Sequence, residues 1–439
     1  MFTISIQKIA AGLLLTVACS TWAAAQNTES LTGVVIVARH GARAPIESET
    51  RSGVFNAQPW PQWPVSPGLL TPHGITALER MGGFYRQQYG SLLTGCASVA
   101  VQSTNVPRTI ASAKAVMKVV APGCDVDVKA ELTTDPPGLG KAELADAING
   151  RIGDDPAWFT ETYARPLKTM HDVLTMCAGC KEVPDFRVKM LDSTPNTMMG
   201  SQAMRGPLHA PSVLQRDPRK ENAVALGADF AENLLLEYVE GMSMQDVGWG
   251  RVDRAKLDEL MEMNTRYHDF LLRTPLWSKA AAAPLAEKIR RMLRFAATPS
   301  DQVLITGSTR RVPVKTRFFY LSAHDANLGW LGGLLQLDWK VSDEAQNATP
   351  PGSAMIFELW HDATTNQNTV RVKFVAQTLD QIRNLTPLTA GVLDPNAGAH
   401  AGAEKPSISP VYVPGCSGAG PEYACLLSDF ERVVNERVR

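Results

Sequence analysis

The stretch GVVIVARHGARAP, residues 33–45, decides how this chain is organised. Its first half is a run of five apolar residues, four of them β-branched, which predicts a fully buried strand of a parallel sheet. His40 follows between Arg39 and Arg43 at the carboxyl end of this strand, where open α/β sheets place their ligands. Guanidinium planes match phosphate oxygens bidentately, and Gly41 allows a sharp turn and a close approach to a ligand. The stretch therefore predicts phosphate held beside a histidine nucleophile, against the alternative of a solvated basic turn.

A second apolar run, FFYLSAHDAN at residues 318–327, places His324 and Asp325 after another predicted strand. Taken alone, this pair is also compatible with a capping aspartate beside a core histidine. Together with the first stretch, it completes the groups that phosphomonoester hydrolysis requires. These are a nucleophile, positive charge around the transferred group and a proton donor for the leaving oxygen.

Both stretches resemble signatures of the histidine acid phosphatase family, the branch of the histidine phosphatase superfamily that includes bacterial phytases and glucose-1-phosphatase. The resemblance runs from about residue 31 to the C-terminus and is weakest in the middle third. It implies an α/β fold: a phosphoglycerate mutase-like α/β/α sandwich with a central, mostly parallel sheet and an inserted, mostly α-helical domain. We therefore expect an α/β core at 26–146 and 266–439 with the helical insertion at 147–265, preceded by a signal peptide at 1–25.

The resemblance also implies a role for each residue of the pocket. His40 would attack phosphorus and form a phosphohistidine, while Asp325 would protonate the leaving oxygen and then help to activate the hydrolytic water. The groups that bind the phosphoryl oxygens would be Arg39, Arg43, Arg108 and His324. Arg108 begins a predicted helix, and a helix N-terminus favours anions. Because the acid must be protonated for part of the time, we expect activity to favour acidic pH.

Two further residues are candidates for substrate binding. Arg273 matches an arginine that helps to bind anionic substrate in phytase-type members, with an ordinary helix-end charge as the alternative. Glu47, after Ile46, stands where those members carry a Thr-Lys pair, and a carboxylate there would repel the many charges of phytate. We predict an acid phosphatase with phytase activity. The alternatives are a glucose-1-phosphatase-like sugar phosphatase, a non-catalytic phosphate-binding protein and a phosphoglycerate mutase-like transferase, against which export and disulfides argue.

Residues 1–25 have the pattern of a secretory signal, with a positive charge at Lys8, an apolar run over 9–18 and small residues at 23–25. The apolar run is too short for a membrane anchor. A balance of 43 basic against 44 acidic residues gives no overall charge to attract nucleic acid or a membrane surface. We therefore expect an exported protein, periplasmic or secreted, that acts as a monomer on a small phosphate ester.

Removing the signal leaves an even number of cysteines, which in an exported protein indicates disulfides. Proximity in sequence favours the pairs Cys96–Cys124, Cys177–Cys180 and Cys416–Cys425, one set among the many that the cysteines allow. The CAGC spacing of the middle pair also suits a redox or zinc site, but no second cysteine pair or suitable histidine cluster accompanies it. We expect neither a metal nor another cofactor.

The remaining pattern predicts where further elements lie. Strands are expected at 99–101, 303–305, 317–321, 354–360 and 370–375, and helices after Thr71 and Val106 and at 228–241 and 257–272. Between about 141 and 300 strand-like runs disappear, which predicts helices that pack over the sheet and form one wall of the cleft. The segment 397–406, rich in Gly and Ala, is expected to be a surface loop.

Overall fold

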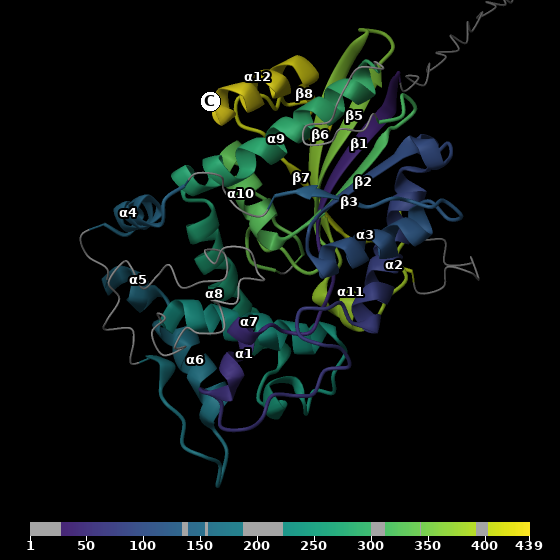
Figure 1. Cartoon of the computed structure of the whole chain (residues 1–439). Coiled ribbons are helices and arrows are strands. Elements are labelled where there is room, and N and C mark those ends of the chain that lie inside the picture. Colours follow the sequence, from purple (N-terminus) through teal and green to yellow (C-terminus); the bar gives the residue numbers. More distant parts are fainter. Residues whose placement is uncertain are drawn as a thin grey trace, which may run out of the picture.

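The computed structural model describes residues 28–133, 139–153, 157–187, 223–299, 312–342, 344–391 and 403–439. At its centre lies one sheet with the strand order β3-β2-β4-β1-β5-β6-β7, in which β8 also pairs with β6 (Figure 1). The strands are β1 Glu29–Arg39, β2 Val99–Thr104, β3 Lys129–Leu132, β4 Phe318–Ala323, β5 Ala354–Asp362, β6 Gln367–Ala376, β7 Ser407–Val411 and β8 Cys425–Leu426. Strands β3, β2, β4 and β1 run parallel, and the strands beyond β1 extend the sheet antiparallel. The predicted α/β class is confirmed, and the parallel part of the sheet carries both signature stretches.

Strands β1 and β4 are neighbours in the sheet although they lie far apart in the sequence. Their register pairs Val34 with Phe318 and Arg39 with Ala323, so both strands end at the same level. The contact continues one residue further, where the backbone N–H of His40 donates to the carbonyl of Ala323 at 3.0 Å. The residues that follow the two strands therefore leave the sheet side by side, as parallel strands require.

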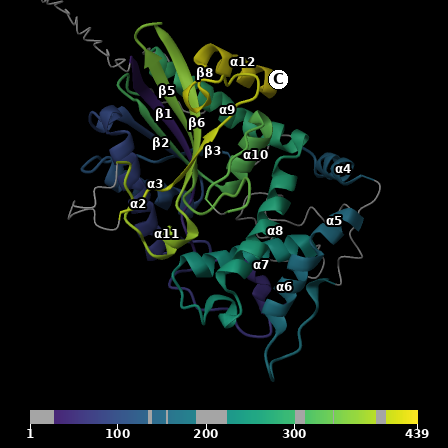
Figure 2. The same cartoon turned by 180° about the vertical axis from the view of Figure 1, so that it is seen from behind.

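Strand β1 is buried on both faces, as its continuous apolar run predicts. Val35 and Val37 pack into the core formed with helices α9 Pro275–Ala297, α10 Asp325–Leu335 and α12 Leu427–Val438. The alternate residues Val34, Ile36 and Ala38 pack into a second core with helices α2 Pro72–Gln88 and α3 Pro107–Val120. Figure 2 shows these two groups of helices on opposite sides of the sheet. The layering is that of an α/β/α sandwich.

A helical region adjoins the carboxyl end of β1 (Figure 1). Its helices are α4 Lys141–Ile152, α5 Ala157–Thr162, α6 Ala164–Thr175, α7 Ala223–Val239 and α8 Arg254–Leu272, and no strand occurs among the described residues from 139 to 299. Helix α7 is buried along its whole length, and its apolar side chains belong to the same core cluster as Val35 and Val37. The expected limits of the insertion, 147 and 265, fall inside α4 and α8 respectively, and the division into domains stays a prediction.

Helices α2 and α3 begin at signals that the sequence contains. Thr71 caps α2, since its Oγ1 accepts from the N–H of Gly74 at 2.9 Å, and Pro72 occupies the first turn. Pro107 occupies the same place in α3, which puts Arg108 in the first turn of that helix. Of the remaining expectations, the signal at 1–25 and the strand at 303–305 lie outside the described residues. Of the loop at 397–406 only residues 403–406 are described, and Glu404 forms a backbone bridge with Leu388.

Three disulfides join Cys96 to Cys124, Cys177 to Cys180 and Cys416 to Cys425. The pairing that sequence proximity favours is confirmed, so the CAGC spacing belongs to a bridge in this structure. Among the described helices, none combines the length and the apolar character needed to cross a membrane.

Candidate active site

Six residues that the sequence singles out meet at the carboxyl edge of the parallel strands. Strand β1 leads into Arg39, His40 and Arg43, β4 leads into His324 and Asp325, and the first turn of α3 supplies Arg108. All of them except Asp325 are at least nine-tenths buried. Two separate signatures and one helix start thus form a single pocket.

His40 is buried and its ring is oriented by a neighbouring carbonyl. Its Nδ1 lies 2.9 Å from the backbone oxygen of Gly41, and because a carbonyl only accepts, Nδ1 carries the ring hydrogen. Burial and the positive charges of Arg108, Arg43 and Arg39 lower the pKa of His40 well below its usual value, so the ring is neutral. Nε2 therefore has a free lone pair, which is what a nucleophilic imidazole requires.

Gly41 has a packing role that the sequence did not reveal. A Cβ at this position would lie 2.7 Å from Cδ1 of Leu78 in helix α2, closer than side-chain atoms approach. The residue has no positive φ, so its backbone conformation is open to other residues. The glycine is needed for packing the signature loop against α2.

Two buried carboxylates hold the arginines of the first signature in place. Glu49, in the short helix α1 Glu47–Thr50, receives a bidentate pair from Arg43, with Nη1–Oε2 at 2.8 Å and Nη2–Oε1 at 2.6 Å. Glu232 of α7 pairs with Nη2 of Arg39. Although burial lowers the pKa of each arginine, Glu49 raises that of Arg43 and Glu232 raises that of Arg39, so both stay charged.

Sequence reasoning missed both of these acids because each acts through a tertiary contact. Glu232 did leave a signal, since a carboxylate in a mostly apolar helix is expected to have a partner when the helix is buried. Glu49 left no such signal, because it lies in a polar stretch that is typical of a loop or a helix start.

Arg108 and His324 form the far wall of the pocket. Burial and the charge of Arg43 lower the pKa of Arg108 to about 9, which leaves it positive at neutral and acidic pH. Its Nη2 lies 3.4 Å from Nδ1 of His324, whose Nε2 lies 2.9 Å from Oγ1 of Thr104. Burial and the charge of Arg108 lower the pKa of His324 to about 3, so this ring is neutral in the empty pocket. The rings of His40 and His324 meet edge to face, with 5.4 Å between their centroids.

Asp325 stands at the mouth of the pocket, with 45 % of its side chain exposed. Its Oδ2 lies 3.2 Å from Nη2 of Arg39, and its Oδ1 accepts from the N–H of Ala326 at 2.7 Å. Burial raises the pKa of Asp325, but the charge of Arg39, together with His268 and His324, lowers it below its usual value. The carboxyl group is therefore ionised before a substrate arrives.

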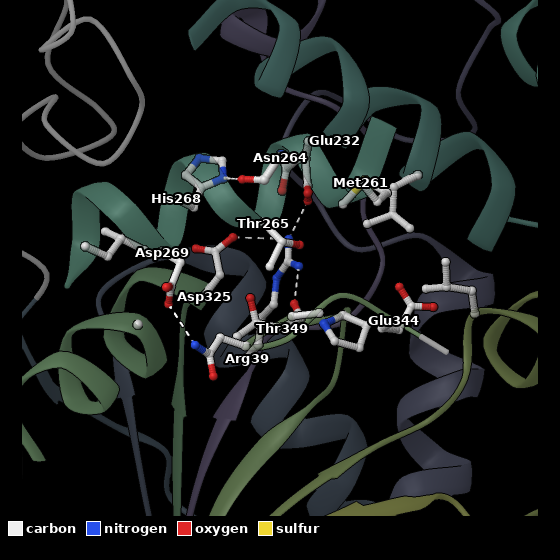
Figure 3. A pocket seen from close by; sticks show the side chains of 17 residues that line it. Arg39, Glu232, Met261, Asn264, Thr265, His268, Asp269, Asp325, Glu344 and Thr349 are labelled. Atoms are coloured by element: carbon white, nitrogen blue, oxygen red, sulfur yellow. Dashed lines mark hydrogen bonds and ion pairs between the residues drawn. The ribbon is translucent and has the colours of Figure 1, made fainter. Parts of the chain in front are cut away.

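Figure 3 shows a second pocket, which shares Arg39 and Asp325 with the first. Helix α8 supplies Asn264, His268 and Asp269, and the segment before β5 supplies Glu344 and Asn347. With Glu232 and Asp325, its described lining contains four carboxylates against one guanidinium, that of Arg39. We call it the leaving-group pocket, because its lining includes Asp325, the expected proton donor to the leaving oxygen.

The arginines near the leaving-group pocket are shared between several acids. Arg254 contacts Asp258 at 2.7 Å, Glu344 at 3.0 Å and Asp380 at 3.4 Å. Arg273 contacts Asp338 at 2.8 Å and Asp269 at 3.3 Å. Negative charge therefore exceeds positive charge at this end of the cleft.

The two residues expected to bind substrate lie outside both sets of lining residues. The guanidinium of Arg273 contacts Asp269 and Asp338 and donates to the carbonyl of Leu337 at 2.8 Å, which fixes the end of α8 to the turn after α10. Glu47 is exposed in the first turn of α1 and accepts from the hydroxyl of Ser52. A substrate-binding role for either residue stays a prediction.

A neutral buried histidine faced by three guanidinium groups, at the carboxyl edge of a parallel sheet and with an acid at its rim, is the arrangement expected of a phosphoric monoester hydrolase. The chain belongs to the histidine phosphatase superfamily (branch 2), whose family model matches residues 30–144 and 156–375. This is the family of histidine acid phosphatases whose signatures the sequence resembles.

Relatives of known activity share nearly the whole chain. It is 28% identical to the phytase AppA of Escherichia coli, over 95% of this chain and 94% of that protein. It is 26% identical to the glucose-1-phosphatase of Salmonella typhimurium, over 81% of this chain and 83% of that protein. Among solved structures, the Hafnia alvei phytase in complex with myo-inositol hexakis sulphate matches with a TM-score of 0.70 at 27% identity, covering 94% of this chain and 98% of that one.

Proposed function

We propose that this protein hydrolyses phosphomonoesters through a phosphohistidine formed at Nε2 of His40. The observation that carries the proposal is the hydrogen bond from Nδ1 to the carbonyl of Gly41, which leaves a neutral Nε2 among three guanidinium groups. Those groups, on Arg39, Arg43 and Arg108, are positioned to stabilise the charge that the phosphoryl oxygens carry in the transition state.

The reaction divides into two displacements at phosphorus. In the first, Nε2 of His40 forms the N–P bond while the ester P–O bond breaks, and Asp325 gives its proton to the leaving oxygen. In the second, water attacks the phosphohistidine, the Asp325 carboxylate accepts a proton from that water, and the N–P bond breaks. Inorganic phosphate leaves, and both residues return to their starting states.

The charge state of Asp325 has to change when substrate binds. In the empty pocket the positive charge of Arg39 keeps the carboxyl ionised. A bound phosphoryl group places negative charge beside Arg39 and offsets that effect, which raises the pKa of Asp325 in the complex. Since the proton is present below this raised pKa and lost above it, the rate of ester cleavage falls as pH rises.

Phytate is the first candidate substrate, because the relatives that match nearly the whole chain are phytases. The leaving-group pocket favours a second candidate, a sugar phosphate such as glucose-1-phosphate. Its four carboxylates would repel further phosphates on the leaving group, whereas the amides of Asn264 and Asn347 suit hydroxyl groups. The carboxylate of Glu47 would also repel further phosphates if it faces the substrate.

The three disulfides suit an oxidising compartment. We propose that residues 1–25 direct export and are then removed, and that the mature protein acts as a monomer, without nucleic acid, in the periplasm or outside the cell. Mass spectrometry of the N-terminus of secreted protein, and light scattering of the purified protein, test these two points.

Phosphate release at about pH 4–5, measured in parallel with phytate and glucose-1-phosphate, tests the function. Turnover of either ester that disappears in the His40→Ala variant supports the proposal, and the ratio of kcat/KM values ranks the two substrates. A phosphate-binding protein without activity would show no turnover in either form while keeping its affinity for inorganic phosphate. That result would contradict the proposal.

A further inference from the structure

The two ring nitrogens of His324 have different partners, and these fix the position of the ring hydrogen. Nη2 of Arg108 lies 3.4 Å from Nδ1, and since a guanidinium only donates, Nδ1 is the acceptor. The neutral ring then carries its hydrogen on Nε2, which lies 2.9 Å from Oγ1 of Thr104. Thr104 must therefore accept this hydrogen bond.

A second threonine explains why Thr104 accepts rather than donates. Oγ1 of Thr109 lies within hydrogen-bond distance of two backbone carbonyls, those of Thr104 at 3.0 Å and Val106 at 2.9 Å. With the Thr109 hydrogen directed to a carbonyl, the 2.8 Å contact between the two hydroxyls is a bond donated by Thr104. The lone pairs of Thr104 then face Nε2–H. Both threonines are fully buried, which shields this relay from bulk solvent.

We propose that Thr104 is a positioning residue that keeps the hydrogen of His324 on Nε2, so that the ring gains its second proton at Nδ1 when phosphate binds. This inference rests on the proposed function. It concerns the state of the pocket that receives the phosphoryl group, and it is independent of which ester is cleaved.

The proton has a source in the substrate itself. A phosphate ester is a monoanion below its second pKa of about 6, and so brings a P–O–H group into the pocket. If the ring stayed neutral, a lone pair of the phosphoryl oxygen would face the lone pair of Nδ1, and the two would repel each other. When the proton moves, the O–H bond breaks and an Nδ1–H bond forms, which leaves a dianionic phosphoryl group beside an imidazolium that donates to it.

The surroundings of His324 favour this transfer only in the complex. The charged groups facing the ring are Arg108 of α3, Arg39 and Arg43 of the first signature, and Asp325 of α10, with the ring of His40 opposite. In the empty pocket burial and the arginines disfavour the imidazolium. A phosphoryl group offsets the arginine charges and thereby reverses this preference.

Nitrogen NMR of the protein labelled with ¹⁵N-histidine, recorded near pH 5 with and without inorganic phosphate, tests the proposal directly. The signals of His324 are assigned by their loss in His324→Gln. We expect a free protein with hydrogen on Nε2 and a bare Nδ1, and a phosphate complex with both nitrogens protonated. Hydrogen on Nδ1 in the free protein, or a ring that stays neutral in the complex, would overturn the proposal.

Variants of the two threonines separate positioning from simple packing. Thr104→Ser keeps the hydroxyl and should retain the wild-type tautomer and phosphate affinity. Thr104→Val has a similar shape without the hydroxyl. It should weaken the tautomer preference, which then depends on the 3.4 Å contact of Arg108 alone, and should lose about tenfold in phosphate affinity. In Thr109→Val the hydroxyl of Thr104 loses its acceptor and turns to donate to Nε2, so the ring hydrogen should move to Nδ1. Wild-type tautomers in both valine variants would contradict the proposed relay.

Failure of this inference is distinguishable from failure of the proposed function. Ester turnover that depends on His40, combined with the wrong tautomer of His324, would refute only the role of Thr104. The predicted tautomers with phosphate bound, but no ester turnover, would refute only the proposed function.

Discussion

The two ends of the cleft carry opposite charge, although only Asp325 and Arg39 separate them. At the phosphate end, Arg43 forms a bidentate pair with the single carboxylate of Glu49, and Arg108 faces a neutral histidine. At the leaving-group end the arrangement is reversed, since Arg254 contacts three carboxylates and Arg273 contacts two. A protein without an overall charge bias can thus attract one phosphoryl group and discourage a second, because the sign of the charge changes within one cleft.

The largest expected effect comes from removing the nucleophile at the phosphate end. His40→Ala should lower kcat/KM for any ester by at least about a thousandfold, because no other group among the described residues has its geometry. His361→Ala, on β5 and outside both pockets, is the matched control and should leave turnover unchanged. Comparable loss in both variants would point to a general disturbance of the fold.

Asp325, at the boundary between the two ends, should show an effect that depends on the leaving group. Asp325→Asn should lower kcat about 10²- to 10⁴-fold for glucose-1-phosphate, whose alkoxide needs a proton. With p-nitrophenyl phosphate the loss should be much smaller, since that leaving group departs as a stable anion. Stopped assays of the wild type from about pH 3 to 8 should also show a rate that falls as pH rises, because Asp325 loses the proton that it donates. Equal losses with both esters would argue against proton donation by Asp325.

Glu49 tests whether the positive charge at the phosphate end needs its buried partner. Glu49→Gln leaves the guanidinium of Arg43 buried without its counter-charge, and should lower the free energy of unfolding by about 3 kcal/mol. Glu262→Gln removes an exposed partner of Arg266 and should change the free energy of unfolding by less than about 0.5 kcal/mol. Urea unfolding of both variants makes the comparison. If Glu49→Gln and Glu262→Gln lower the free energy of unfolding by the same amount, the Arg43–Glu49 pair is as well solvated as a surface pair.

The smallest effect is expected at the leaving-group end. Glu344→Gln removes one carboxylate from that lining and should raise kcat/KM for phytate relative to glucose-1-phosphate by a factor of about 2–10. Glu259→Gln is the control. Glu259 lies on helix α8, outside this pocket, and its substitution should leave the ratio unchanged. A Glu344→Gln ratio equal to wild type would show that this charge does not reach the substrate.

The phosphate pocket could be predicted from the sequence because its residues directly follow buried strands. Apolar runs located β1 and β4, and since parallel strands end at a common edge, His40 and His324 had to lie close together. Arg108 could be placed for a similar reason, because it opens the helix after the neighbouring strand β2. The disulfides followed from proximity alone.

The residues that support the pocket could not be predicted in the same way. Glu232 reaches Arg39 from a helix nearly 200 positions away, a contact that local periodicity does not encode. Gly41 also makes room for Leu78, and this becomes visible only once α2 is packed. Arg273 matched an anion-binding position, yet its partners are Asp269, Asp338 and a backbone carbonyl.

The central claim, that Nε2 of His40 takes the phosphoryl group, is tested most directly by trapping the intermediate. Asp325→Asn is mixed with ³²P-labelled p-nitrophenyl phosphate, quenched in alkali within one turnover and digested for mass spectrometry. Because this variant forms the intermediate with a good leaving group but lacks the base for its hydrolysis, we predict an alkali-stable, acid-labile phosphate on the peptide that contains His40. Label on another residue, or turnover without any labelled peptide, would contradict the account.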